Sequence, residues 1–147
     1  MTGRKFVLGY DGSEGSKAAL EWCREYAPGL DAEVVVVGAV NVVPLIGLAP
    51  AGAPTTGMSI DAMVAAAKDV ASEATTSLRD AGVRCRSVVE VLHPAELLDR
   101  VARDESADLI VVGRRGHGGF AEMLLGSVPH SLSHHAHRPL VIVPFAG

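Results

Sequence analysis

Short apolar runs alternate along the chain with segments in which apolar residues recur every three or four positions. The runs lie at 5–10, 33–40, 108–112 and 140–143, and each has the length and apolar content of a buried strand. The intervening segments have the spacing of amphipathic helices. The pattern predicts a protein in which strands and helices alternate from one end to the other.

The expected helices begin at recognisable residues. The first spans 14–27, with Ser13 as its N-cap, and a later one starts at Pro94, where a missing N–H costs little. A last helix of roughly ten residues opens at Gly126–Ser127. Between them, a helix over 59–81 carries an apolar stripe formed by Met63, Ala66, Val70, Ala74 and Leu78.

The segment 84–91 differs from the other strands because apolar and polar residues alternate along it, which is typical of a half-exposed edge strand. Strand–helix alternation implies right-handed crossovers and a parallel sheet with helices on both faces. We therefore expect an α/β fold with a doubly wound, five-stranded parallel sheet in the order 3-2-1-4-5, a Rossmann-like arrangement.

The fifth strand, Leu140–Val143, would form the other edge of this sheet. It is wholly apolar and carries no charged residue that would discourage pairing, so we expect a second copy of the chain to cover it. The alternative is that the flanking Pro139 and Pro144 are enough to block the edge.

Composition narrows the function. The 147 residues suit one domain, 1–147, and 48% of them are apolar. A net charge of −4 with no basic stripe argues against nucleic acid as a partner. Cys23 and Cys85 lack the spacing of a zinc site, and no apolar run approaches a membrane span of about 20 residues. With no signal peptide recognised, we expect a cytoplasmic protein with reduced cysteines.

Two loops should meet beyond the carboxyl ends of the first and fourth strands, where open α/β sheets bind ligands. One is 9–13 and the other is 113–127, whose glycines let backbone N–H groups approach an anion. The helix that follows adds free amides, a positive dipole end and the Ser127 hydroxyl. These features predict a phosphate site; the alternative is a mobile surface loop.

The second loop also resembles a known signature. Its spacing, Gly113-x2-Gly116-x9-Gly126-Ser127, is similar to the nucleotide-binding motif of the universal stress protein family. The resemblance extends to the Asp-Gly-Ser turn at 11–13, the run Ala-Asp-Leu-Ile-Val-Val-Gly at 107–113, and Arg-Pro-Leu-Val-Ile-Val-Pro at 138–144. It covers the whole chain and implies the fold of the adenine-nucleotide α-hydrolases.

The resemblance also implies roles for individual residues. Asp11 would lie near the ribose or near the metal and phosphates, Ala39 and Val40 would contact adenine, and Gly9 would leave room for the nucleotide. The remaining candidates lie in the second loop, where they would hold phosphates and ribose or line the site: Gly113, Arg114, Arg115, Gly116, His117, Gly118, Gly126, Ser127 and Val128. For His117, contact with phosphate and exposure to solvent are equally expected.

On this resemblance the chain belongs to the ATP-binding branch and takes ATP with Mg²⁺, the metal held in part by Asp11. It would act as a dimer through its last strand and regulate stress or dormancy responses through a downstream protein partner. ATP would close 41–57 and 113–127 around itself and make the dimer more rigid. Two departures weaken the match: Pro129 removes an amide and a hydroxyl from the last helix, and Gly38-Ala39 leaves a thinner adenine wall.

Other chemistries have less support. The sequence contains no GxxxxGK[ST] phosphate loop, and no nucleophile is paired with a base. A slow ATPase or autokinase and a dimeric interaction module that binds no nucleotide stay as alternatives. His130 and His134 are four residues apart, beside His135 and His137, so a metal site is conceivable, but a polar solvent-facing helix explains them as well.

Overall fold

The computed structural model describes residues 3–42, 59–115 and 125–145. They form one parallel sheet in the order β3-β2-β1-β4-β5, so the predicted order is confirmed. Strand β2 has the predicted bounds. The elements are β1 (Lys5–Gly9), α1 (Glu14–Tyr26), η1 (Pro28–Leu30), β2 (Glu33–Val40), α3 (Ile60–Asp80), β3 (Cys85–Val91), α4 (Pro94–Asp104), β4 (Leu109–Gly113), α5 (Ser127–His135) and β5 (Leu140–Val143).

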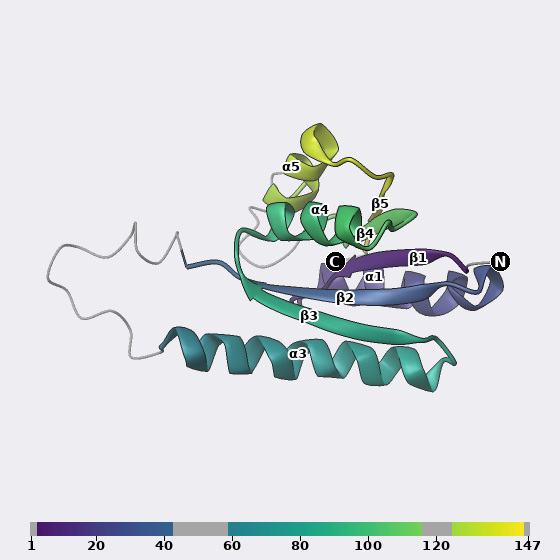
Figure 1. Ribbon diagram of the computed structural model, residues 1–147, viewed down its shortest axis with the longest axis horizontal. Coiled ribbons are helices and arrows are strands. Elements are labelled where there is room, and N and C mark those ends of the chain that lie inside the picture. Colours follow the sequence, from purple (N-terminus) through teal and green to yellow (C-terminus); the bar gives the residue numbers. More distant parts are fainter. Residues whose placement is uncertain (1–2, 43–58, 116–124, 146–147) are drawn as a thin grey trace, which may run out of the picture.

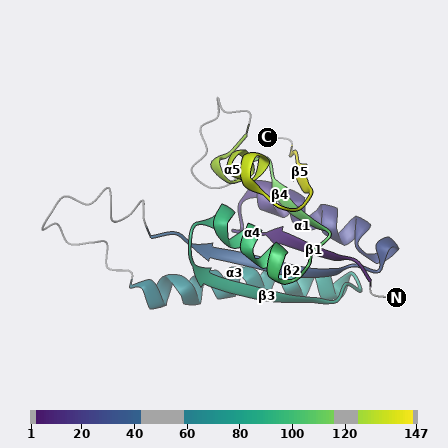
Figure 2. The same cartoon turned by 45° about the horizontal axis from the view of Figure 1, so that its top comes forward.

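The sheet lies between two layers of helices (Figures 1 and 2). Helices α1 and α3 cover one face, and α4 and α5 cover the other. Strands β1, β2 and β4 are buried on both faces, because alternate side chains enter the two cores. Phe6 and Leu8 of β1 pack with α1 and α3, whereas Val7 packs with α4. This two-sided burial explains why these strands are uniformly apolar.

Strands β3 and β5 are the two edges. Along β3, Cys85 and Val89 pack on the α1–α3 side and Val88 on the α4 side, so the predicted alternation is confirmed. All four residues of β5 are half-buried, although every one of them is apolar. Within the described residues, no strand pairs with the outer side of β5.

The stripe predicted for α3 is only partly right. Ala74 and Leu78 are buried, but Ala66 is exposed, and Ala71 and Thr75 complete the buried face instead. The first turns of α3 extend past the strands that its second half covers (Figure 1), so spacing alone cannot say which of its alanines meets the sheet. The predicted lid at 41–57 lies outside the described residues from position 43 onward.

The helix ends follow local chemistry. Ser13 and Ser59 cap α1 and α3 through their hydroxyl groups, the first as predicted. After α3 the chain turns at Gly82, whose φ of +79° suits glycine better than any other residue. None of the helices in the described ranges is long and apolar enough to cross a membrane.

Candidate functional site

The carboxyl ends of β1 and β4 lie side by side in the sheet, and each continues into one of the two loops singled out from the sequence. Strand order reverses between these two strands, because the chain passes from β1 to β2 on one side and reaches β4 on the other. The crevice outside such a reversal is the usual ligand site of an open α/β sheet.

The first loop is held by its own hydrogen bonds. The carboxylate Oδ1 of Asp11 accepts a bond from the N–H of Ser13 at 2.9 Å, and Ser13 Oγ accepts one from the N–H of Ser16 at 3.2 Å. Gly12 has a φ of +81°, which an L-residue adopts only at a cost. These contacts fix Asp11 at the start of α1 with its side chain exposed at the edge of the sheet.

Negative charge gathers at this end of β1. Burial raises the pKa of the Tyr10 hydroxyl, and the charges of Glu73, Asp11 and Glu14 raise the pKa further. All three carboxylates therefore act on the same point beside the first loop. An anionic ligand that binds here needs hydrogen-bond donors or cations to offset them.

The second loop touches the first turn of α1, just after the first loop, through a pair of glycines. A Cβ at Gly113 would lie 2.3 Å from the backbone of Gly15, and a Cβ at Gly15 would lie 1.8 Å from the carbonyl oxygen of Arg115. The end of β4 therefore packs on the helix that follows the first loop, and the predicted meeting of the two loops around a ligand stays a prediction. Gly113 does not have a positive φ, so its lack of a side chain is explained by close packing on α1. Gly15 was not singled out from the sequence; a glycine in the first turn of a helix was the available signal.

The amino terminus of α5 differs from those of the other α-helices in the described residues. Before α1, α3 and α4, the side chain of Ser13, Ser59 or His93 accepts a hydrogen bond from an amide of the first turn. Gly126, which precedes α5, has no side chain that could do so. The first amides of α5 therefore lack the local partner that the other helices have.

Two amides of α5 are left to bind something else. The N–H of Gly126 donates to the carbonyl of Arg114 at 2.8 Å, and Pro129, which is buried, has no N–H. The N–H groups of Ser127 and Val128 form no hydrogen bond within the part of the chain that the structure describes. With the exposed Ser127 hydroxyl, they provide three donors beside the positive end of the helix dipole.

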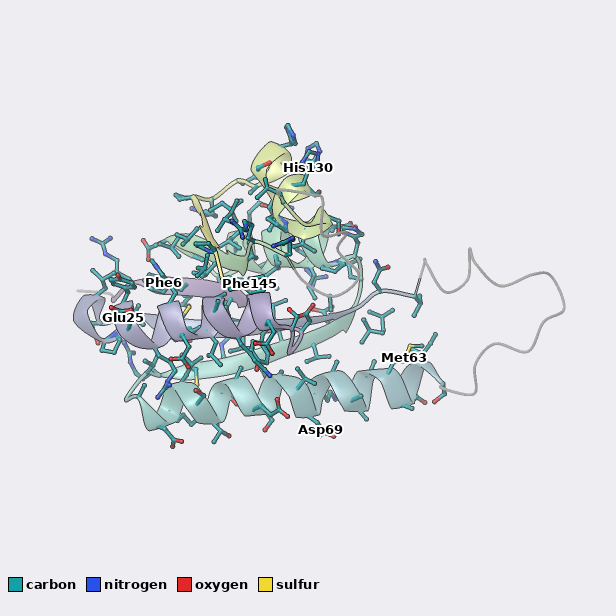
Figure 3. The ribbon with its side chains drawn as sticks, turned by 180° about the vertical axis from the view of Figure 1, so that it is seen from behind. Phe6, Glu25, Met63, Asp69, His130 and Phe145 are labelled. Atoms are coloured by element: carbon teal, nitrogen blue, oxygen red, sulfur yellow. The ribbon has the colours of Figure 1, made fainter. Side chains whose placement is uncertain are left out.

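The adjacent arginines occupy different environments. Arg114 continues the pairing of β4 with β5, since its N–H donates to the carbonyl of Val143 at 2.9 Å. Its Nε is buried and has no hydrogen-bond partner. The guanidinium of Arg115 lies over the ring of Phe145, at 5.8 Å from the centroid. Phe145 itself lies beside α1 (Figure 3), within 3.4 Å of a Cβ built at Gly15.

The candidates near β1 and β2 have packing roles as well. A Cβ at Gly9 would come within 3.1 Å of Leu98 and 3.2 Å of Val112, so it would fit only if these side chains shifted slightly. Val40 is buried and its carbonyl accepts a bond from the N–H of Leu92 at 3.1 Å, whereas Ala39 is half-buried on the α4 side. The predicted contacts of these residues with a nucleotide stay predictions. Gly116, His117 and Gly118 lie outside the described residues.

The histidines near the C-terminus lie away from this crevice. A hollow of about 620 Å³ lies between α4 and α5, lined by His93, Ala95, Glu96, Asp99, Ser131, Leu132, His134, His135 and His137. The Asp99 carboxylate accepts hydrogen bonds there from the backbone N–H and the ring Nδ1 of His137, both at 2.9 Å. His130 points away from the sheet (Figure 3). In the described ranges, no three His, Cys, Asp or Glu residues are grouped so that they could hold a metal ion.

The comparison with protein families gives one match: the model of the universal stress protein family covers residues 3–144. Universal stress protein MJ0531 of Methanocaldococcus jannaschii is 31% identical over 144 residues, which are 95% of this chain and 81% of that protein. Universal stress protein Rv1996 of Mycobacterium tuberculosis is 32% identical over an alignment that covers 98% of this chain. The chain spans about half the length of that relative, 49%.

Solved structures share the fold. The structure of MJ0577, also from M. jannaschii, superposes with a TM-score of 0.84 at 21% identity, and the match covers 100% of this chain and 99% of that one. A universal stress protein in complex with cAMP superposes with a TM-score of 0.72 at 24% identity, with 98% of each chain covered. An Arabidopsis thaliana family member with AMP bound superposes with a TM-score of 0.68 at 15% identity, and the match covers 98% of this chain and 93% of that one.

Proposed function

The chain belongs to the universal stress protein family, and on that premise we propose that it is an ATP-binding regulator whose nucleotide site is the crevice beyond β1 and β4. One observation carries the proposal: among the α-helices in the described residues, α5, which starts in the glycine motif, is the one whose first turn no side chain caps. The N–H groups of Ser127 and Val128, with the Ser127 hydroxyl, suit a phosphate group in number and polarity.

The solved relatives support the same ligand class. Of the superposed family members, one binds cAMP and another binds AMP, and both ligands join an adenine to a ribose that carries a phosphate. In this chain the phosphate would lie at the start of α5, and the ribose and adenine would extend toward β1 and β2, where Gly9, Ala39 and Val40 lie.

A magnesium ion fits the first loop. The exposed Asp11 carboxylate stands at the carboxyl end of β1, and carboxylate oxygens are hard ligands that Mg²⁺ prefers, together with the phosphate oxygens of a nucleotide. Such an ion would also reduce the repulsion between a polyphosphate and the carboxylates near Tyr10. Asp11 would hold the ion, and the ion would neutralise phosphate charge.

A pair of substitutions at Ser127 tests the site. Ser127 is the first residue of α5, where proline is well tolerated, and Gly126 before it is already extended, with φ −69° and ψ 172°. Ser127→Pro therefore removes one amide donor and the hydroxyl with little change to the helix, whereas Ser127→Ala removes the hydroxyl alone. Calorimetric titration of nucleotide-stripped protein with Mg·ATP should give micromolar binding in the wild type, moderate weakening in Ser127→Ala, and a loss of about tenfold or more in Ser127→Pro.

Wild-type protein that takes up no adenine nucleotide would refute the proposal, and so would a Ser127→Pro variant that binds as tightly as wild type. Gly113→Ala is unsuitable for this test. The added methyl group would overlap the backbone of Gly15, so a loss of binding would report a disturbed fold. Thermal unfolding of each Ser127 variant separates lost binding from lost structure.

We propose regulation by nucleotide occupancy, since the described residues place no nucleophile–base pair in the crevice. Ser13 and Ser16 bond to each other and to the backbone of the first loop, which leaves them a structural role. Release of phosphate from Mg·ATP distinguishes a regulator from a slow ATPase. The regulator predicts a rate at the background of the buffer, and a rate that falls in Asp11→Asn would favour the ATPase instead.

We further propose that the protein is a homodimer joined through β5. In a parallel pair the backbone N–H and C=O of one residue point to the same neighbouring strand. Val141 and Val143 therefore bond to β4, and the backbone N–H and C=O of Ile142 point to the open side of β5. Ile142→Pro removes an outward N–H and spares the pairing with β4, whereas Ile142→Ala keeps the N–H and loses a similar amount of packing. Light scattering should show a dimer for wild type and Ile142→Ala, and a monomer for Ile142→Pro. A dimer that persists in Ile142→Pro would contradict this interface.

A further inference from the structure

Arg114 is held at both ends of its backbone beside the start of α5. Its N–H donates to Val143 at 2.9 Å, and its carbonyl accepts the N–H of Gly126, the residue that precedes α5, at 2.8 Å. The Arg114 backbone therefore lies next to the residue that precedes Ser127 and Val128. No other arginine in the described residues is tied by a hydrogen bond to this end of α5.

The guanidinium of Arg114 has no partner within the described residues. Its Nε is buried without a hydrogen bond, and no ion pair involves it. A buried donor without an acceptor is costly, and the cost is removed when an acceptor binds. Arg24 and Arg100 also have a buried Nε, but each forms ion pairs through another part of its guanidinium.

Arg115 differs from its neighbour although it stands next to it in the motif. Its guanidinium lies over Phe145, and its carbonyl packs on Gly15 at the start of α1. These contacts join the second loop to α1 and to the residues after β5. We therefore assign Arg115 to packing of the second loop on α1 and Phe145.

The charges around the crevice make a cation important for binding a nucleoside triphosphate. Two amides, a hydroxyl and a helix dipole worth about half a charge can hold a single phosphate group. A triphosphate brings more negative charge to a site where Asp11, Glu14 and Glu73 already act on Tyr10. The additional phosphates need additional positive charge, and Arg114 stands where it can supply it.

We propose that Arg114 binds the phosphates beyond the first one and gives the crevice its preference for nucleoside triphosphates over monophosphates. This inference rests on the proposed nucleotide site. The planar guanidinium can donate two parallel hydrogen bonds to phosphate oxygens, which a lysine cannot reproduce. Arg114 is thus a specificity-determining residue within the motif.

The test compares ATP and AMP as ligands for the full chain, each titrated calorimetrically in the presence of Mg²⁺. Arg114→Gln should weaken ATP binding about 10- to 100-fold and AMP binding less than about threefold. Arg114→Lys should recover part of the loss for ATP. The control is Arg138→Gln, because Arg138 also has a buried Nε without a partner and lies at the opposite, amino end of β5. This control should keep the wild-type ratio of ATP to AMP affinity, and thermal unfolding shows whether each variant is folded.

The outcomes separate this inference from the function on which it rests. If wild type binds neither ATP nor AMP, the nucleotide site itself is refuted. If wild type binds both and Arg114→Gln weakens them equally, the nucleotide site stands and the role of Arg114 is refuted. A ratio lowered by Arg115→Gln or Arg138→Gln, but unchanged in Arg114→Gln, would also overturn the assignment.

Discussion

Replacing Gly15 by alanine tests the contact that joins the second loop of the crevice to the first turn of α1. In an isolated helix the change would be favourable, because alanine stabilises a helix interior by about 1 kcal/mol relative to glycine. In this protein the new Cβ would lie 1.8 Å from the carbonyl oxygen of Arg115 and 3.0 Å from its carbonyl carbon. Atoms cannot approach so closely, so the backbone of one loop has to move.

The size of the effect follows from what resists that movement. Through Arg114, the second loop is bonded to Val143 of β5 and to Gly126 before α5. Adding a methyl group to a packed site of this kind typically costs about 1–3 kcal/mol, which offsets or exceeds the gain in helix propensity. We expect Gly15→Ala to lower the free energy of unfolding by about 2 kcal/mol, measured by urea denaturation. For a chain of this size that corresponds to a Tm lower by about 4–8 °C.

Gly29→Ala is the matched control, since nothing lies within 4 Å of its added Cβ. It should change the free energy of unfolding by less than about 0.5 kcal/mol. The reasoning would be refuted if Gly15→Ala stabilised the protein as it would a free helix, or if the two variants unfolded at the same urea concentration. Weaker nucleotide binding by Gly15→Ala at temperatures where it stays folded would show that the contact also shapes the crevice.

Three further outcomes are expected. Leu98→Ala removes a buried side chain that packs on Gly9, so urea denaturation should show a free energy of unfolding lower by about 2–5 kcal/mol. A decrease of less than about 1 kcal/mol would contradict this packing. Burial raises the pKa of Asp99, but hydrogen bonds from His137 and the charge of Arg103 outweigh it and hold that pKa below its usual value. Asp99 therefore stabilises the fold fully at pH values above the ordinary carboxyl pKa, and this stability is lost as the pH falls through the lowered pKa. The difference in Tm between wild type and Asp99→Asn should shrink from pH 7 to pH 3, and a constant difference would refute this. Burial raises the pKa of Cys23 to about 12, so an aromatic disulfide reagent at pH 8 should label Cys23 only after unfolding, and stability should fall as pH rises above the unfolded thiol pKa of about 8.5.

Much of the fold could be predicted because it depends on neighbours in the sequence. A run such as Val34–Val37 forms a strand buried on both faces, and the alternation at 84–91 identifies an edge, so the strand order followed from the pattern alone. Ser13 could be recognised as a helix cap because its bond is to Ser16, three residues away. The spacing of the glycine motif predicted a phosphate site at the start of the last helix, and that stays a prediction.

Other features depended on contacts between residues far apart in the sequence. Sequence spacing placed Ala66 on the buried stripe of α3, but it is exposed, and the face that meets the sheet includes Ala71 and Thr75 instead. From the sequence, Gly113 was expected to approach a ligand. In the structure it packs on Gly15, which lies 98 residues earlier in the chain. No local pattern encodes such a meeting.

The same limit applies to the two arginines of the motif. From the sequence, Arg114 and Arg115 are adjacent, equal in charge and equally suited to a phosphate. The tertiary structure separates them, because strand pairing holds Arg114 beside the uncapped start of α5 while Phe145 and Gly15 surround Arg115. Sequence by itself determined the elements and their order, since these follow from periodicity and local bonding. Only the packed structure decided which side chains the crevice leaves available for a ligand, because that depends on what each one meets across the fold.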